Sequence, residues 1–197
     1  ETAYMTSHGL RVVDVSNPAN PVQVGFLDLT SGGYLALSGS YLYVTSDGLR
    51  VVDISNPANP VQVGFLEAAL YGNLAISGSY AYVAAEFDGL RVVDISDPAN
   101  PIEVGYFYNP IGFGPACDVA ASESFAYVTG CYLALWVMDV SDPTNPVAVG
   151  YYDQQGLLSD VTLSGGYVYA VNSNSADLDG SLRILDFSDP LNPEQIS

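Results

Sequence analysis

The chain has 197 residues, of which 49% are hydrophobic and only 13% are charged, so it can bury a sizeable core and is not expected to be disordered. Twenty-two acidic residues against four arginines, with no lysine, give a formal net charge of −18. Such a charge repels phosphate backbones and anionic lipid headgroups, which excludes nucleic-acid binding and polybasic membrane binding and favours cations such as Ca²⁺. The sequence has no run of about 18 apolar residues, so we expect no membrane span.

One stretch recurs along the chain. Near copies run from Gly9 to Gly25, from Gly48 to Gly64 and from Gly89 to Gly105, and looser copies begin at Ala134 and Ser181. The aspartates that end the apolar part of each copy are separated by 39, 41, 45 and 47 residues; they are Asp14, Asp53, Asp94, Asp139 and Asp186. A period of this size indicates one supersecondary unit used repeatedly.

Each unit is predicted to contain four short strands, which we name a to d in chain order. In the third unit they are residues 73–77, 80–84, 90–95 and 102–107. A Gly-Ser pair separates strands a and b at Gly39 and Gly78, and such a pair between alternating apolar and aromatic residues predicts a two-residue hairpin. Apolar residues show no helical period in any segment, so we expect an all-β protein.

Strands c and d are joined by a corner that reads Ser-Asn/Asp-Pro-x-Asn-Pro, and ten of the twelve prolines lie in these corners. Proline at a corner removes no hydrogen bond from a strand ladder and holds the preceding residue extended. Strand c is apolar on both faces, as Leu90, Val92, Val93 and Ile95 show, so each of its faces must be covered. Sheets of four strands stacked on copies of themselves provide this cover, and a period near 40 residues is typical of a β-propeller blade.

The stretch Leu90-Arg-Val-Val-Asp-Ile-Ser-Asp-Pro-Ala-Asn-Pro101 resembles the LVIVD repeat, which forms propellers in mostly bacterial surface and secreted proteins. The resemblance covers essentially the whole chain. It implies a β-propeller fold and an extracellular or cell-surface location, and it supplies no catalytic residues.

The repeats predict one propeller domain, residues 1–197, of about five four-stranded blades at 1–29, 30–67, 68–107, 108–153 and 154–197. The pattern provides five copies of strands b, c and d but four of strand a, because the chain begins at a segment that matches strand b. Either the first blade is incomplete or the chain is a fragment of a larger propeller.

The loops between strands b and c and between strands d and a differ most among the units, and they lie on one face of a propeller. A repeat scaffold that varies one face presents that face for binding. The candidate binding residues on this face are His8, Asp47, Phe87, Asp88, Phe113 and Tyr132. His8 is the one histidine of the chain, which leaves little basis for Ser-His-Asp or histidine-metal chemistry.

The loop from 172 to 180 is a weak candidate for a Ca²⁺ site, with oxygen ligands at Asn174, Asp177 and Asp179. A solvated polar turn is the alternative interpretation of the same residues. No other cofactor is expected.

The four arginines occupy one position of strand c, and Trp136 takes that position in the fourth unit. We interpret them as structural groups between blades, since a guanidinium satisfies several acceptors and a large ring fills the same space by packing. These residues are Arg11, Arg50, Arg91, Arg183 and Trp136.

The two cysteines, Cys117 and Cys131, lie at the same end of one predicted hairpin, and we expect a disulfide between them. A two-residue turn places residue 117 opposite residue 130, so the pairing requires a three-residue turn or a bulge before Cys131. Two buried free thiols are the alternative. A disulfide would indicate an oxidising compartment.

These observations favour a non-enzymatic extracellular or cell-surface module that binds a protein or self-assembles through its variable loop face. A carbohydrate-binding propeller that uses loop aromatic residues is the alternative. A glycoside hydrolase that uses acidic residues is a third hypothesis.

Overall fold

The computed structural model describes residues 1–29, 32–108, 114–131, 134–153, 158–172, 180–189 and 193–196, and every regular element in these ranges is a β-strand. The expectation of an all-β chain is confirmed. Within the described ranges no helix has the length and apolar character needed to cross a membrane. The chain packs as two compact units, Glu1–Tyr71 with Ile95–Pro101, and Gly72–Asp94 with Ile102–Ser197.

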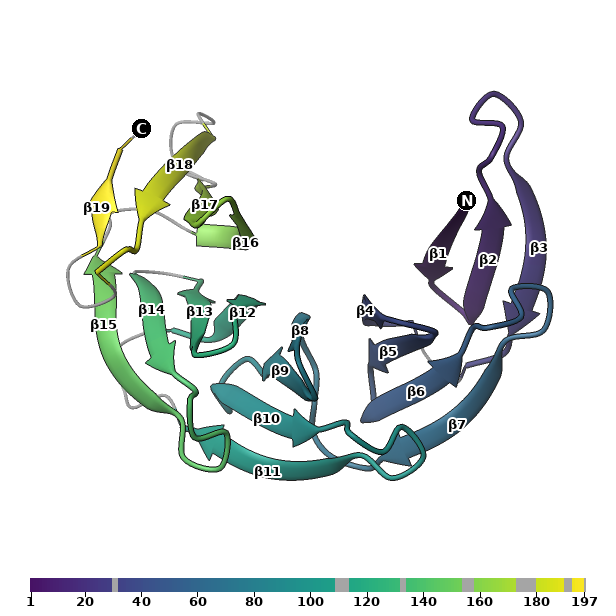
Figure 1. Ribbon diagram of the computed structural model, residues 1–197, viewed down its shortest axis with the longest axis horizontal. Helices are drawn as coiled ribbons and strands as arrows, with labels where there is room; N and C mark the ends of the chain where they lie inside the picture. Colours follow the sequence, from purple (N-terminus) through teal and green to yellow (C-terminus); the bar gives the residue numbers. More distant parts are fainter. Residues whose placement is uncertain are drawn as a thin grey trace. The chain divides into compact units, whose positions relative to one another are not determined.

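The first unit contains two antiparallel sheets, which we number 1 and 2 (Figure 1). Sheet 1 has three strands, in the order β1 (Thr2–Thr6), β2 (Leu10–Asp14) and β3 (Val22–Leu27). Sheet 2 has four strands, in the order β4 (Tyr34–Ser38), β5 (Tyr41–Thr45), β6 (Leu49–Asp53) and β7 (Val61–Leu66).

The second unit contains sheets 3, 4 and 5, each with four antiparallel strands in chain order. Sheet 3 is β8 (Leu74–Ser77), β9 (Tyr80–Ala84), β10 (Leu90–Asp94) and β11 (Ile102–Phe107). Sheet 4 is β12 (Ala116–Ala121), β13 (Phe125–Gly130), β14 (Ala134–Asp139) and β15 (Val147–Asp153). Sheet 5 is β16 (Leu158–Ser164), β17 (Tyr167–Asn172), β18 (Ser181–Asp186) and β19 (Glu194–Gln195).

The strands of each sheet follow the predicted order a, b, c, d, and sheet 1 lacks strand a, as the sequence indicates. The a–b hairpins close on Gly39 and Gly78, whose φ angles are 58° and 57°. The serine that follows each glycine has no positive φ, which is the pattern of a type II′ turn with glycine first.

The aspartate that ends strand c shapes the corner after it. Asp14 Oδ1 accepts a hydrogen bond from the Ser16 backbone N–H at 2.9 Å, and Asn17 Oδ1 accepts one from Ala19 N–H at 3.2 Å. The same pair of side-chain turns recurs after β6 and β14. The repeated Asp and Asn/Asp residues therefore form the turns of the corner. This structural role accounts for most of the recurring acidic positions, and no catalytic or metal-binding role is needed to explain them.

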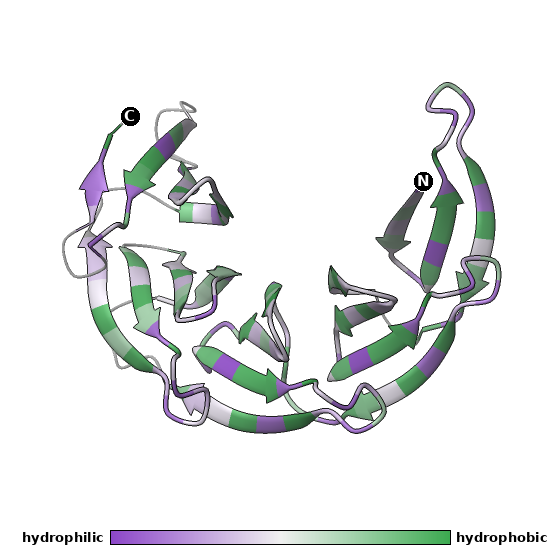
Figure 2. Cartoon of the chain, viewed as in Figure 1, coloured by the Kyte–Doolittle hydropathy of each residue, from purple (hydrophilic) through white to green (hydrophobic). Residues whose placement is uncertain are grey.

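Sheets pack on one another through apolar clusters within each unit. In the first unit Leu10 of β2 packs with Leu42 and Val44 of β5. In the second unit one cluster joins sheets 3 and 4 and another joins sheets 4 and 5. Figure 2 shows strand c of the sheets as mostly hydrophobic, and in β10 Leu90, Val92 and Val93 are at most 1% exposed, as expected for a strand covered on both faces.

The proline corner of one sheet crosses strand d of the sheet before it. A Cβ atom added to Gly64 of β7 would lie 2.1 Å from the Pro98 carbonyl oxygen, and one added to Gly105 of β11 would lie 2.2 Å from the Pro143 carbonyl oxygen. Such contacts are far shorter than van der Waals distance, so only glycine allows the corner to approach this closely. The recurring Val-Gly-Phe/Tyr of strand d thus packs closely against the proline corner that follows it in the chain.

Candidate functional site

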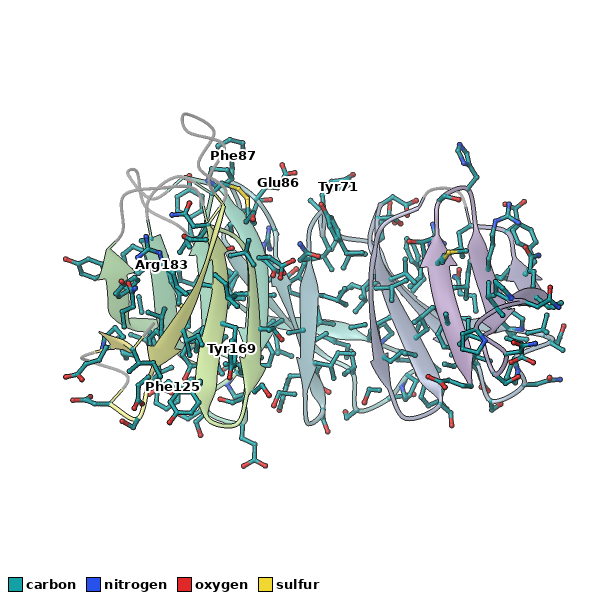
Figure 3. The ribbon with its side chains drawn as sticks, turned by 90° about the horizontal axis from the view of Figure 1, so that it is seen from above. Tyr71, Glu86, Phe87, Phe125, Tyr169 and Arg183 are labelled. Atoms are coloured by element: carbon teal, nitrogen blue, oxygen red, sulfur yellow. A yellow bond between two sulfur atoms is a disulfide. The ribbon has the colours of Figure 1, made fainter. Side chains whose placement is uncertain are left out.

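The loop that joins β9 to β10 presents the most exposed aromatic side chain among the described residues. Phe87 is 73% exposed, and it projects with Glu86 from the same edge of the second unit, the edge opposite to Phe125 (Figure 3). Two additional residues distinguish this loop, Ala85–Gly89, from the corresponding loop of sheet 2, residues 46–48. An ordered loop that carries an exposed phenyl ring is a typical anchor for a binding partner.

Backbone hydrogen bonds fix this loop. Ala85 N–H donates to Gly89 O at 2.8 Å, Asp88 N–H donates to Ala85 O at 2.9 Å, and Gly89 N–H donates to Glu86 O at 3.1 Å. Glu86 has a φ of 48°, a left-handed conformation that non-glycine residues seldom adopt and that the surrounding bonds must hold. Glu86 O also accepts from Ala116 N–H at 2.9 Å, which ties the loop to the start of β12.

The predicted disulfide lies directly beside this tie. Cys117 and Cys131 are bonded with a Cα–Cα distance of 5.5 Å, so this prediction is confirmed. The hairpin keeps a two-residue turn. Its β-bulge is at Cys117 in β12, whereas we expected a bulge before Cys131 in β13. Asn73 Nδ2 donates to Cys117 O at 3.1 Å, which further anchors the bulge.

The other candidate residues of the loop face divide into two groups. His8 is exposed in the β1–β2 loop of the first unit, whereas Asp47 and Asp88 pair with arginines of their own sheets, Asp47 with Arg50 at 2.8 Å and Asp88 with Arg91 at 3.5 Å. The hydrogen bond from the Ser46 hydroxyl, followed by those from Arg50, lowers the pKa of Asp47. Asp47 and Asp88 therefore support their loops.

Five predicted site residues lie outside the described residues. They are Phe113 and Tyr132 of the binding face and the Ca²⁺ candidates Asn174, Asp177 and Asp179. Among the described residues no group of three or more His, Cys, Asp or Glu side chains is arranged to hold a metal ion. The calcium site stays a prediction.

Each arginine of strand c donates a hydrogen bond to strand d of its own sheet, and the interpretation of these arginines as groups between blades stays a prediction. The Nη1 of Arg11 donates to Gln23 at 2.8 Å, that of Arg91 to Glu103 at 2.6 Å, and that of Arg183 to Gln195 at 2.7 Å. Arg50 makes the same bond to Gln62, at 3.1 Å, and its guanidinium lies 4.5 Å from the Phe65 ring centroid. In sheet 5 the link extends to the preceding sheet, because Tyr152 donates to Gln195 Oε1 at 2.6 Å.

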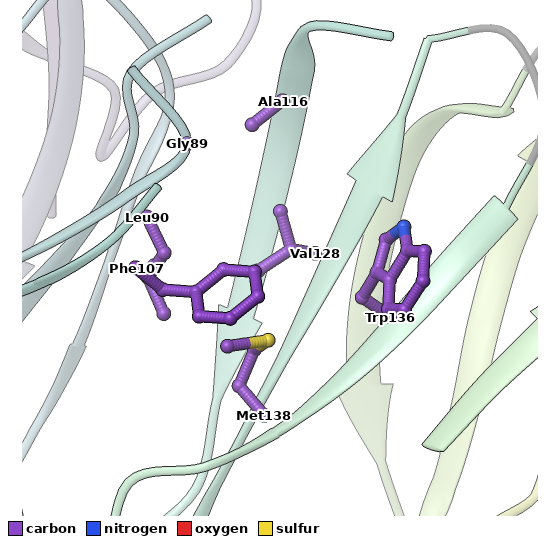
Figure 4. A pocket seen from close by; sticks show the side chains of 7 residues that line it. All are labelled: Gly89, Leu90, Phe107, Ala116, Val128, Trp136 and Met138. Carbon is purple, nitrogen blue, oxygen red and sulfur yellow. The ribbon is translucent and has the colours of Figure 1, made fainter. Parts of the chain in front are cut away.

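Trp136 takes the arginine position in sheet 4 and packs against Tyr151, with ring centroids 5.5 Å apart. Beside it lies a small apolar cavity of about 20 Å³ between sheets 3 and 4, lined by Leu90, Phe107 and Met138 among others (Figure 4). This volume is about that of one water molecule, and its apolar lining offers no partners to hold one. The cavity is a packing gap and not a ligand site.

Sequence reasoning missed a carboxyl pair between sheets 4 and 5. Asp118 of β12 is 8% exposed and accepts a hydrogen bond from Val161 N–H of β16 at 2.7 Å, beside Asp160 of the same strand. Burial raises the pKa of Asp118 to about 6. Hydrogen bonds from the Val161 and Val119 backbone N–H groups lower this pKa, and the nearby Asp160 charge raises it further. The available signal was that both aspartates occupy the same position in strand a of their repeats.

The LVIVD repeat model matches five segments of the chain, residues 3–28, 32–66, 71–108, 113–154 and 155–196. The chain belongs to the LVIVD repeat family. The expected resemblance is therefore confirmed across all five repeats. No curated protein matches the chain.

Solved structures similar to this LVIVD repeat protein confirm the β-propeller fold. A functionally unknown protein from Desulfotomaculum acetoxidans is 13% identical with a TM-score of 0.78, and the match covers 98% of this chain and 65% of that one. Kuenenia stuttgartiensis hydrazine synthase is 16% identical with a TM-score of 0.70, over 95% and 59% of the two chains. BamB from Moraxella catarrhalis is 13% identical with a TM-score of 0.69, over 95% and 55%. At these identities the likeness shows the fold alone, and the chain spans less than two thirds of each of these structures.

Proposed function

We propose that this LVIVD repeat protein is a non-enzymatic extracellular or cell-surface module that binds a protein partner through the face formed by the b–c and d–a loops. The observation that carries the proposal is Phe87, which is 73% exposed on a loop held by four backbone hydrogen bonds and tied to a disulfide-bonded strand. An anchor on a loop of this kind binds at a reduced entropic cost, because the loop backbone is already held before association.

The disulfide supports the extracellular part of the proposal. Cys117 and Cys131 are bonded in one hairpin, and disulfides persist in oxidising compartments such as the cell exterior. The net charge of −18 is suited to a basic or neutral partner and opposes an acidic one.

The non-enzymatic part of the proposal rests on the roles of the acidic residues. Asp14, Asp53 and Asp139 accept backbone hydrogen bonds in turns, and Asp47 and Asp88 pair with arginines. Asp118 and Asp160 are the pair that most resembles a general acid and its partner. Asp118 is 8% exposed and its carboxylate accepts the Val161 backbone N–H, whereas a glycosidase needs both carboxyl groups to reach the scissile bond.

The proposal is tested by comparing partner capture by the wild type, Phe87→Ala and a control, Tyr167→Ala. Tyr167 is 37% exposed beside the a–b turn at the opposite end of its sheet. The three immobilised proteins are exposed to extracellular and cell-envelope proteins, and each captured protein is then purified and titrated against the three variants. Phe87→Ala is expected to weaken binding by about tenfold or more, as at a hot spot, and Tyr167→Ala to leave it unchanged.

Equal binding by Phe87→Ala and the wild type would contradict the proposal. A glycan array probed with the same three proteins serves as the second arm. Retention of glycans alone, lost in Phe87→Ala, would replace the protein partner by a carbohydrate one at this loop.

A further inference from the structure

Figure 1 shows the corner between β14 and β15 crossing β11 within the second unit. A groove lies at this crossing. It has a volume of about 510 Å³ and is lined by Glu103, Val104, Gly105, Tyr106, Thr144 and Asn145. The crossing exists because Gly105 has no Cβ to collide with the corner. Val92 of β10 pairs with Gly105 and Val93 pairs with Glu103, so β11 has a bulge at Val104. The bulge interrupts the alternation of side chains between the two faces of the sheet, and residues 103–106 all line the groove.

The repeats supply two internal controls for this groove. The same crossing occurs at Gly25 beneath Pro57 and at Gly64 beneath Pro98. At both of these crossings strand d reads Val-Gln-Val-Gly-Phe-Leu, and the crossing corner carries Ala-Asn. Three residues that line the groove differ from their equivalents at the other two crossings, and each is more polar or more acidic. Glu103 stands in place of Gln, Tyr106 in place of Phe and Thr144 in place of Ala. Two segments about 40 residues apart have thus diverged from the repeat at one place in space.

These replacements leave polar groups available to a ligand. Arg91 holds Glu103 Oε1 at 2.6 Å, which fixes the carboxylate while Oε2 has no hydrogen-bond partner within the described ranges. Tyr106 is 64% exposed, and within those ranges its hydroxyl makes no hydrogen bond. The Thr144 hydroxyl donates to Asp142 Oδ1 at 2.7 Å, so its oxygen can still accept a hydrogen bond.

The corner asparagine of the groove differs from the asparagine at one of the two other crossings. In the corner after β10, Asn100 Nδ2 donates to Asp97 Oδ2 at 2.8 Å. In the corner after β14, Asp142 Oδ1 instead binds the hydroxyl and backbone N–H of Thr144. Among the described residues the side-chain amide of Asn145 has no partner, and it faces the groove as both a donor and an acceptor.

We propose that this groove binds a neutral saccharide. An exposed tyrosine ring provides a flat apolar surface for a sugar ring, Glu103 Oε2 accepts hydrogen bonds from sugar hydroxyls, and the Asn145 amide pairs with adjacent hydroxyl and ring oxygens. Among the described residues no arginine lines the groove, the neighbouring Arg91 is paired with Glu103, and the chain carries a net charge of −18, so uronic and sulfated sugars are disfavoured. The site is separate from the Phe87 loop and does not depend on the function proposed for that loop.

The test is a titration of ¹⁵N-labelled protein with four separate trisaccharides, cellotriose, maltotriose, mannotriose and trigalacturonate, followed by amide chemical shifts. With at least one neutral trisaccharide, we expect saturable shifts at the amides of residues 103–106, 144 and 145. The amides of residues 23–26, 58 and 59 form a control within the same spectrum, since they make the equivalent crossing with the repeat's own side chains.

The matched variant is Glu103→Gln with Tyr106→Phe and Thr144→Ala, which recreates the side chains of the other two crossings. This variant is expected to fold, because Gln62 already accepts the equivalent bond from Arg50 at 3.1 Å, and to bind about tenfold more weakly or worse, which corresponds to the loss of one or two hydrogen bonds. No saturable shift with any neutral trisaccharide at millimolar concentration, equal shifts at the control crossing, or unchanged binding by the variant would each overturn the proposal. Preferential binding of trigalacturonate would overturn the assignment to a neutral sugar.

Discussion

Gly25 lies directly beneath the carbonyl oxygen of Pro57, so close that a Cβ atom on Gly25 would stand 2.0 Å from that oxygen. The glycine belongs to strand d of one repeat, and the proline belongs to the corner of the next. The two most recognisable parts of the repeat, Val-Gly-Phe and Asn-Pro-Ala-Asn-Pro, are therefore the two halves of one contact. This contact accounts for the retention of both segments without reference to any ligand.

The contact predicts that alanine is not tolerated at these glycines. Gly64→Ala should lower the free energy of unfolding by about 2 kcal/mol or more, because the new methyl group must displace a proline backbone. Urea denaturation measures the change. Gly39→Asn is the control, since a Cβ at Gly39 meets nothing within 4 Å and asparagine accepts its φ of 58°. Equal losses in the two variants would show that the crossing is looser than described.

The carboxylate pairing of Arg91 predicts a salt-dependent effect of substitution. Arg91→Lys should destabilise the protein by about 1 kcal/mol, because an ammonium cannot span Glu103 and Asp88 as the guanidinium does and the site is partly screened by water. The same substitution at Arg11, whose observed partner is the neutral Gln23, is the control. The Arg91 effect should shrink in high salt while the Arg11 effect stays constant. A salt-independent loss at Arg91 would contradict an electrostatic role.

The raised pKa of Asp118 predicts an unusual pH dependence of stability. Its pKa rises from the ordinary 3.8 to about 6 on folding, so the folded protein binds a proton that the unfolded chain releases between these values. Stability should therefore increase as the pH falls from above 6 towards 4, by the linkage of proton binding to folding. Asp118→Asn should be at least as stable as the wild type at pH 7.5, because the amide oxygen can still accept the Val161 N–H, and should lose this component of the pH dependence.

The Asx-turn aspartates act in the opposite direction and in a lower pH range. Backbone hydrogen bonds lower the pKa of Asp14 and Asp53, so their contribution is present above the ordinary pKa and is lost as the pH falls through the lowered one. Thermal melts of wild type and Asp118→Asn between pH 4 and 8 separate the two effects. Parallel melting profiles for the two proteins would show that Asp118 titrates normally.

Trp136 replaces the strand c arginine in sheet 4, and a double-mutant cycle with Ala148 tests how that position depends on strand d. Trp136→Arg alone should destabilise by about 2 kcal/mol or more, because strand d offers Ala148 where other sheets offer Gln or Glu. Adding Ala148→Glu restores the partner that Arg91 has in Glu103 and should recover about 1 kcal/mol or more. Chemical denaturation of the two single variants and the double variant measures the coupling. Additive effects would mean that the arginines of strand c do not depend on strand d.

The sequence predicted the fold closely because each strand boundary has its own local signal. The Gly-Ser pairs mark the a–b turns, and the predicted strand at 80–84 coincides with β9. Strand c ends one residue earlier than predicted, because Asp94 ends the ladder and the corner begins at Ile95. The disulfide was predictable from two cysteines at one end of a hairpin, whereas the place of its bulge was not, since a bulge in either strand produces the same pairing.

The sites were less predictable because they depend on contacts between repeats. Asp118 and Asp160 occupy equivalent positions, but the sequence does not reveal that Asp118 is buried against β16 and accepts the Val161 N–H. The groove between β11 and the following corner likewise requires knowing that one repeat's corner crosses the strand of the preceding repeat. In contrast, Phe87 was predictable from the two additional residues in its loop.

The central claim, that this LVIVD repeat protein binds its partner through the loop that departs from the repeat, is tested most directly by a loop exchange. In this variant Ala85–Gly89 is replaced by Ser-Asp-Gly, the corresponding loop of sheet 2. Both loops are closed by an equivalent backbone hydrogen bond, from Ala85 N–H to Gly89 O at 2.8 Å in sheet 3 and from Ser46 N–H to Gly48 O at 3.0 Å in sheet 2. The measurement is the affinity of the partner captured by the wild type, with the thermal melt and the intact Cys117–Cys131 disulfide as controls. The account predicts loss of binding in a folded, oxidised protein. Undiminished affinity in the exchanged protein would contradict it.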